Sequence, residues 1–231
     1  MSGKTVDYDK LFTDFNTMAS NRSLRILMCI CIDSSFSMQG RIRDINRGIR
    51  EFLQQLSENQ LAVDAAEICL VTFGKEVKVL SDFGKVKQAL DAVTASGGIA
   101  ASGSQTKMGQ AVMTALDHLE KHRAELKTVG VNFYDPWLIL ISDGDATDNC
   151  GPAVRRVQKM HRDIRLKVKC LSMGDGSEQL KEFTTDGSVD RLEDLQVMDF
   201  FAMLSRSISQ ASQASIQGGA VDLQWHGGGV R

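Results

Sequence analysis

Residues 26–32 of the 231-residue chain are apolar at every position (ILMCICI), and this run constrains the fold more than any other feature. A strand without a polar face must be covered on both sides, as happens in the centre of a parallel sheet that has helices on each face. Seven residues are far fewer than the roughly 20 that a helix needs to cross a bilayer. The run therefore predicts the central strand of a layered α/β domain.

Short apolar runs alternate with amphipathic stretches along the rest of the chain, which is typical of an α/β fold. Ile42, Ile45 and Ile49 recur at helical spacing within residues 38–56. We expect further strands at 67–73, 76–80, 137–142, 166–172 and 189–192, and further helices at 84–93, 106–123, 150–162 and 197–214. Because only residues 74 and 75 separate the second and third strands, we expect these two to be antiparallel and to form an edge of a mainly parallel sheet.

The chain is expected to form one domain, residues 24–214, with an N-terminal extension at 1–23 and a Gly-rich C-terminal tail at 215–231. Its 27 basic and 29 acidic side chains nearly cancel, so no bulk field favours nucleic acid or an anionic membrane. Aromatic residues make up 6% of the chain, which leaves few side chains to stack on bases. We therefore expect neither nucleic acid nor a membrane as a partner.

Five cysteines and the first 25 residues bear on the compartment. The N-terminal segment has no apolar stretch, so we expect no signal peptide. The cysteines are odd in number, three of them lie in apolar runs, and none has the spacing of a metal ligand set. Reduced, buried thiols of this kind indicate a cytoplasmic protein.

Three polar segments follow predicted strands or precede a predicted helix. The first is Asp33-Ser34-Ser35-Phe36-Ser37, the second contains Thr106 just before Met108-Gly109, and the third begins Ser142-Asp143-Gly144. In an open α/β sheet, ligands bind beyond the carboxyl ends of the strands, where these segments would meet. Carboxylates and hydroxyls without histidine suit a hard cation such as Mg²⁺ or Mn²⁺. The alternative for each segment taken alone is an ordinary helix N-cap.

Taken together, the D-x-S-x-S, T-x-M-G and S-D-G-x-x-T-D segments resemble the metal-ion-dependent adhesion site of von Willebrand factor type A domains. The resemblance covers residues 24–214 and implies a Rossmann-like three-layer fold. It also implies that a divalent cation, Mg²⁺, Mn²⁺ or Ca²⁺, is held by five side chains: Asp33, Ser35, Ser37, Thr106 and Asp143. The implied function is a non-catalytic interaction module whose protein partner presents an acidic residue to the ion, without a small-molecule substrate.

Residues 103–111 and 200–209 look most like the TerY-like branch of this family, which implies a role in tellurium resistance or a related stress response. Phe36, Lys107, Asp145 and Asp148 are candidates for the rim that contacts the partner. The sequence departs from many relatives in two ways. Phe36 stands where a Gly is common. The segment 96–105 is longer than the corresponding segment of many relatives, so this loop is either a flap over the site or a harmless insertion.

The main alternative is an enzyme that resembles haloacid-dehalogenase-like phosphatases. In that interpretation Asp33 is the nucleophile, and Thr106, Lys107, Asp143 and Asp148 complete a Mg²⁺ centre. Such chemistry usually needs a second Asp two residues after the nucleophile as general acid, and this position is Ser35. The sequence therefore favours the interaction module.

Three histidines fall among charged residues on predicted helices. For His118, His122 and His161 we expect positions on solvated helix surfaces.

Overall fold

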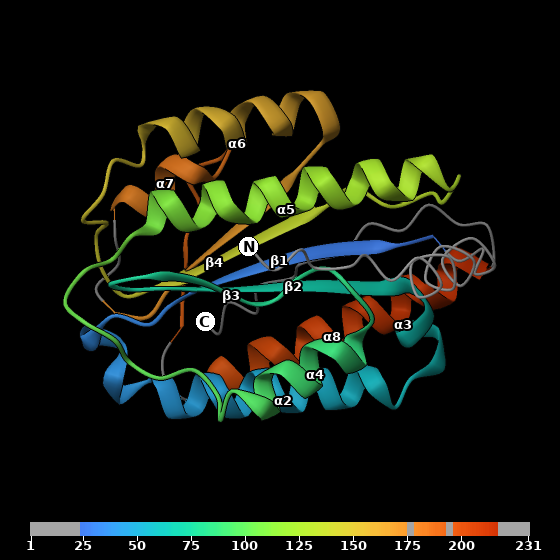
Figure 1. Ribbon diagram of the computed structural model, residues 1–231, viewed down its shortest axis with the longest axis horizontal. Coiled ribbons are helices and arrows are strands. Elements are labelled where there is room, and N and C mark those ends of the chain that lie inside the picture. The colour runs from blue at the N-terminus through green and yellow to red at the C-terminus, as the bar shows by residue number, and fades with distance from the viewer. Residues whose placement is uncertain (1–23, 175–177, 193–195, 217–231) are drawn as a thin grey trace, which may run out of the picture.

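A six-stranded sheet forms the middle layer of the protein, which a computed structural model describes for residues 24–174, 178–192 and 196–216 (Figure 1). The strands lie in the order β3-β2-β1-β4-β5-β6, and every neighbouring pair is parallel except β2 and β3. Their bounds are β1 Ile26–Asp33, β2 Ala66–Phe73, β3 Val77–Ser81, β4 Trp137–Ser142, β5 Lys167–Ser172 and β6 Asp190–Arg191. The predicted extension 1–23 and nearly all of the predicted tail 215–231 lie outside the described residues.

Helices cover both faces of this sheet (Figure 1). One layer contains α2 Ile42–Ser57, α3 Gln60–Ala65, α4 Val86–Ala95 and α8 Gln196–Ile216, and the other contains α5 Met108–Thr128, α6 Gly151–Ile164 and α7 Glu178–Phe183. A short 3₁₀ helix, η1 Phe36–Gly40, precedes α2. Among the described residues no helix is long and apolar enough to span a membrane.

The alternation of side chains along β1 explains why the strand is apolar throughout. Met28 and Ile30 belong to the core under α2 and α8, whereas Cys29 and Cys31 belong to the core under α5. All eight residues of the strand are buried. The prediction of a central strand in a mainly parallel sheet is therefore confirmed.

The antiparallel edge strand is also confirmed, because β3 lies outside β2 and pairs with it in antiparallel register. Two short helices, α3 and α7, were not predicted. Each has only six residues, too few for apolar periodicity to be visible. The side chain of Asn59 caps α3 by accepting hydrogen bonds from the backbone N–H groups of Leu61 and Ala62.

The prediction that His122 lies on a solvated surface is wrong. The residue is buried on α5, where its ring hydrogen-bonds to the carboxylate of Glu67 and stacks on Phe83 with the ring centroids 5.0 Å apart. Glu67 also accepts a 2.9 Å hydrogen bond from Nε of Arg25, which is itself buried. A polar cluster of Arg25, Glu67 and His122 thus lies at the amino-terminal end of the sheet. The charged neighbours Lys121 and Arg123 conceal this role in the sequence.

Candidate metal centre

The candidate site lies where two neighbouring parallel strands, β1 and β4, end side by side. After β1 the chain continues to β2 on one side of it, whereas β4 lies on the other side. Such a reversal of strand order opens a crevice at the carboxyl edge of an α/β sheet. Asp33 is the last residue of β1, and Asp143 directly follows β4. The topology therefore brings together two residues that are 110 positions apart.

Asp33 is fully buried and is hydrogen-bonded on both carboxylate oxygens. Its Oδ1 accepts a 2.8 Å bond from the backbone N–H of Ser35, and its Oδ2 accepts a 2.5 Å bond from the hydroxyl of Ser142. Burial raises the pKa of the Asp33 carboxyl, and the nearby Asp143 carboxylate raises it further, although the two hydrogen bonds act in the opposite direction. A cation bound here would offset the cost of burying this charge.

Ser35, Ser37 and Asp143 form a continuous chain of hydrogen bonds beside Asp33. The two serine hydroxyls are 2.9 Å apart, and the Ser37 hydroxyl donates a 2.7 Å bond to Oδ1 of Asp143. The backbone turns from extended geometry at Ser35 into η1, which places both hydroxyls on the same side. The structure thus brings together four of the five predicted ligands.

Thr106, the fifth predicted ligand, is buried and held by its backbone. Its N–H donates a 3.0 Å bond to the hydroxyl of Thr147, and its carbonyl accepts a 2.9 Å bond from the N–H of Thr147. Among the described residues, no hydrogen bond joins the Thr106 hydroxyl to the other four predicted ligands. The loop after β4 therefore fixes the position of Thr106 through the main chain.

The loop of residues 96–105 is bound along its length and crosses the carboxyl edge of the sheet from α4 towards α5 (Figure 1). The Asn46 side chain donates to the carbonyl of Ile99 at 2.8 Å and accepts from its N–H at 2.7 Å. The N–H of Ser102 donates a 2.6 Å bond to the carbonyl of Ser34, next to the candidate ligands. The loop is therefore hydrogen-bonded both to α2 and to the segment that carries the candidate ligands, and it is not an unattached insertion.

Phe36 lies between the two ligand serines and is 57% exposed. Its N–H donates a 2.9 Å bond to the carbonyl of Gly103. Among the described residues, Arg165 is the non-glycine residue with positive φ, so Phe36 is not strained at the position where many relatives have Gly. The aromatic ring is one of two large hydrophobic side chains that the described part of the chain exposes.

The other rim candidates differ in their surroundings. Asp145 is exposed and Lys107 is half-buried. Asp148 caps α5, because its two carboxylate oxygens accept 3.1 Å and 2.8 Å bonds from the N–H groups of Gly109 and Gln110. Asp148 therefore helps to fix the position of α5, which begins two residues after Thr106.

Sequence reasoning assigned no role to two serines at this edge, although Ser142 begins the third polar segment. Ser142 bonds to Asp33, and Ser172 is its partner in the β4–β5 register. The Ser172 hydroxyl is buried and has no hydrogen-bond partner within the described segments. The available signal was a serine at the last position of each strand, after apolar residues.

The donor set fits a hard divalent cation. It consists of two carboxylates and three hydroxyl groups, all of them oxygen donors, as Mg²⁺, Mn²⁺ and Ca²⁺ prefer. No cluster of three or more His, Cys, Asp or Glu side chains that could hold a metal occurs in residues 24–174, 178–192 and 196–216. The five cysteines are buried free thiols. A cation at this edge therefore depends on the hydroxyl groups as well as on Asp33 and Asp143.

The chain is similar in structure to several proteins of known structure. The von Willebrand factor domain of the type V pili tip protein Mfa5 from Porphyromonas gingivalis superposes with a TM-score of 0.59 and 14% identity, over 87% of this chain and 99% of that one. A von Willebrand factor type A protein from Catenulispora acidiphila gives 0.58 and 16%, over 80% and 43%. Proximal thread matrix protein 1 from the mussel byssus, with a zinc-occupied MIDAS motif, gives 0.56 and 18%, over 81% and 48%.

The present chain thus spans less than half the length of the last two proteins. At these identities the likeness shows the fold alone. No curated protein sequence matches the chain significantly. The family model described as "von Willebrand factor type A domain" matches residues 28–203, which is most of the chain. The six-stranded sheet, the helices on both of its faces and this match show that the chain belongs to the von Willebrand factor type A domain family.

Proposed function

We propose that the protein is a non-catalytic interaction module that uses a divalent cation to bind a protein partner. The observation that carries the proposal is the hydrogen-bonded chain Ser35–Ser37–Asp143 beside the buried carboxylate of Asp33. This arrangement gathers oxygen donors from two strand ends at one point of the molecular edge. Three of the five donors are neutral hydroxyl groups, so only two carboxylates offset the charge of the ion. Such an ion can still attract a further oxygen ligand from a partner.

In the proposed mechanism Asp33 and Asp143 supply the negative charge, and Ser35, Ser37 and Thr106 supply neutral oxygens. Ser142 and the N–H of Ser35 hold the Asp33 carboxylate in place. The bound cation, which we propose to be Mg²⁺, Mn²⁺ or Ca²⁺, would accept an oxygen of an acidic side chain from the partner.

Two relatives support a divalent cation. One mussel byssus structure has a zinc-occupied MIDAS motif, and the TRAP protein of Plasmodium vivax was crystallised in a manganese-loaded form. The motifs at 103–111 and 200–209 further support a place in the TerY-like branch and a role in tellurium resistance or stress response. The five buried thiols are compatible with a cytoplasmic location, which we also propose.

The phosphatase alternative receives no support from the side-chain arrangement. Ser35 stands where the general acid would be needed, and a hydroxyl group does not ionise near neutral pH. The carboxylate of Asp148, which the enzyme would direct to the metal, is bonded to the N-terminus of α5.

The proposal is tested by titrating the protein with Mn²⁺ and Mg²⁺ in a calorimeter. We expect saturable binding that Asp33→Ala abolishes. Asp91→Ala is the matched control, because Asp91 lies on the surface of α4 and pairs with Lys87 there. A pull-down from lysate of the native cells, with Mg²⁺ or with EDTA, then tests whether partner binding requires the ion. Identical partners in both conditions would contradict the ion-dependent mechanism.

A further inference from the structure

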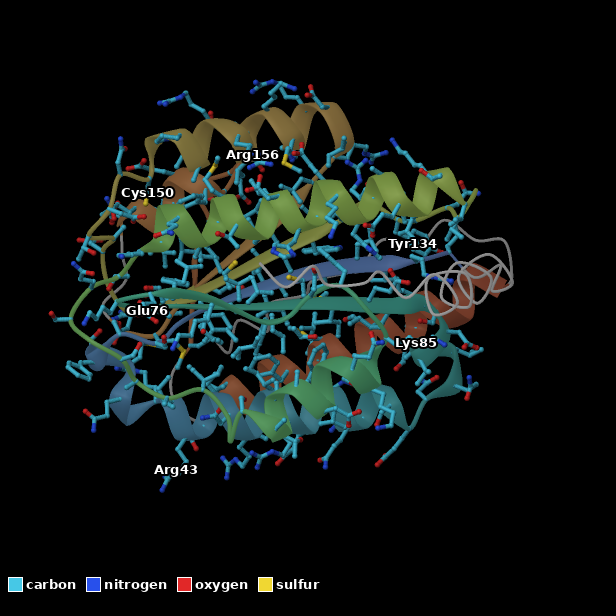
Figure 2. All side chains as sticks on the ribbon, in the orientation of Figure 1. Arg43, Glu76, Lys85, Tyr134, Cys150 and Arg156 are labelled. Carbon is cyan, nitrogen blue, oxygen red and sulfur yellow. The ribbon has the colours of Figure 1, made fainter. Side chains whose placement is uncertain are left out.

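Asn46 lies on α2 and is bonded to the loop of residues 96–105. Its Nδ2 donates a 2.8 Å bond to the carbonyl of Ile99, and its Oδ1 accepts a 2.7 Å bond from the N–H of the same residue. Arg43, three residues earlier on the helix, instead projects away from α2 into solvent and is 92% exposed (Figure 2). The pair of bonds satisfies both backbone groups of Ile99, so it fixes this residue relative to α2.

A glycine allows the loop to approach Asn46 closely. Gly98 has a φ of +95°, and a Cβ at this position would lie 2.9 Å from Oδ1 of Asn46. A side chain there would therefore strain the backbone and push against the amide. The side chain of Ile99 is buried and belongs to the same hydrophobic core as the apolar face of α2. The loop is thus anchored at residues 98 and 99 before it reaches the candidate metal centre.

Three residues after Ile99, the loop is bonded to both neighbours of Ser35. The N–H of Ser102 donates a 2.6 Å bond to the carbonyl of Ser34. The next carbonyl of the loop, that of residue 103, accepts a 2.9 Å bond from the N–H of Phe36. Ser35 lies between these two bonds, so a shift of this part of the loop moves the backbone that carries the predicted ligand.

We propose that Asn46 is a positioning residue of the candidate metal centre, although it is not one of the predicted ligands. Through Ile99 and the loop it holds Ser35, and with it Ser37, in the arrangement that offers both hydroxyl groups to a cation. This inference rests on the proposed function. Three residues of chain span at most about 11 Å, so the release of Ile99 from α2 is transmitted to Ser102.

The alternative is that Asn46 only stabilises the fold, and Asn59 provides the matched control for this. The Asn59 side chain also makes two hydrogen bonds to the backbone, since it accepts from the N–H groups of Leu61 and Ala62. It precedes α3 and therefore lies at the amino-terminal end of β2, whereas the loop crosses the carboxyl edge of the sheet (Figure 1). Asn46→Ala and Asn59→Ala each remove two such bonds, but only the first acts on the loop.

The test titrates the wild type and both variants with Mn²⁺, and measures amide hydrogen exchange in the metal-free proteins by NMR. We expect Asn46→Ala to bind Mn²⁺ about tenfold more weakly, because the group that holds a ligand is lost. The amides of Ser102 and Phe36 should exchange faster in this variant. Water-proton relaxation per bound Mn²⁺ should rise, since water replaces a displaced hydroxyl group on the ion. Asn59→Ala should match the wild type in all three measurements.

Folding of the variants is checked by circular dichroism. Ala is favourable in the interior of a helix, which helps Asn46→Ala to fold. If this variant does not fold, Gly98→Ala replaces it, because the new Cβ pushes the loop away from an intact Asn46. The same changes in Mn²⁺ affinity and amide exchange are expected.

The outcomes separate this inference from the proposed function. If the wild type binds no Mn²⁺, the proposed function fails and the inference fails with it. If the wild type binds Mn²⁺ but Asn46→Ala and Asn59→Ala bind it with the same affinity, only the role of Asn46 is overturned, even when the loop amides exchange faster. Weaker Mn²⁺ binding confined to Asn46→Ala, together with faster exchange at Ser102 and Phe36, supports the role.

Discussion

The hydroxyl of Ser142 donates a 2.5 Å hydrogen bond to Oδ2 of Asp33, and this bond joins the ends of β4 and β1 at a buried carboxylate. The two residues are 109 positions apart in the chain. Burial withdraws this carboxylate from water, which costs free energy when no cation is bound, and the bond from Ser142 offsets part of that cost.

Asp33→Asn should raise the melting temperature of the metal-free protein at pH 7. Burial raises the pKa of Asp33 in the folded state above its unfolded value, so the charged group reduces stability at any pH above the folded pKa. This penalty disappears below the unfolded pKa, about 3.9, where the carboxyl is neutral in both states. Calorimetry in EDTA at pH 7 and pH 3.5 checks the difference. An unchanged melting temperature at pH 7 would contradict the penalty, and the variant should also lose stabilisation by Mn²⁺.

Metal affinity should fall as the pH is lowered, and the fall should begin above the range of an ordinary Asp. Protons compete with the cation for Asp33, and the raised pKa of this carboxyl moves the competition to higher pH. Titration with Mn²⁺ at pH 7, 6, 5 and 4 measures the effect. Constant affinity down to about pH 4 would mean that the carboxyl has an unperturbed pKa.

Alanine substitutions at Ser142 and Ser172 should have opposite effects on stability. Ser142→Ala removes a donor from a buried carboxylate and should cost about 1–3 kcal/mol. Ser172→Ala removes a buried hydroxyl that has no partner among the described residues, and should stabilise the fold by about 1 kcal/mol. Urea unfolding of both variants is a matched comparison, because the two serines are partners in one register. Equal destabilisation of both would show that the Ser172 hydroxyl is satisfied in solution.

Gly74→Ala should weaken metal binding more than it weakens the fold. A Cβ at this position would lie 2.7 Å from the carbonyl of Ser102 and 3.2 Å from the carbonyl of Ser34, so both loops must move. Ser34 directly precedes the ligand Ser35. Gly40→Ala is the control, because a Cβ there has no atom within 4 Å. Equal Mn²⁺ affinities for the two variants would exclude this close approach.

Glu67→Ala should cost about 3–5 kcal/mol of unfolding free energy, because it leaves the buried Arg25 and His122 without their shared carboxylate. Asp91→Ala, which removes the surface ion pair with Lys87, is the comparison and should cost less than about 1 kcal/mol of unfolding free energy. Chemical denaturation measures both. Similar costs for the two variants would show that the cluster contributes no more than a surface ion pair.

Much of the fold could be predicted because it depends on local patterns. The wholly apolar strand β1 required two covered faces, and the helical spacing of Ile42, Ile45 and Ile49 required a helix on one of them. The position of Asp33 at the end of that strand followed directly. The β2–β3 pair was predictable as well, since a short turn leaves few alternatives to an antiparallel hairpin.

The remaining features depend on contacts between distant parts of the chain. His122 lies between Lys121 and Arg123, and Nε2 of its buried ring bonds to Glu67, 55 residues earlier. Asp148 resembled a rim residue, but α5, which begins 40 residues before it, uses its carboxylate as a cap. Neither pairing leaves a signal in the local sequence, because each is set by the order of the strands.

The cluster of Arg25, Glu67 and His122 lies at the opposite end of β1 from the candidate metal centre. Arg25 precedes β1 and Asp33 ends it, so at about 3.3 Å per residue the cluster and the candidate metal centre are about 26 Å apart. At this separation two unit charges interact by only about 0.6 kcal/mol at an effective dielectric constant of about 20. The amino-terminal end of the sheet is thus a suitable place to attach a surface or a fluorophore if the domain is developed as a cation sensor, since labels there leave the ion and its ligands untouched.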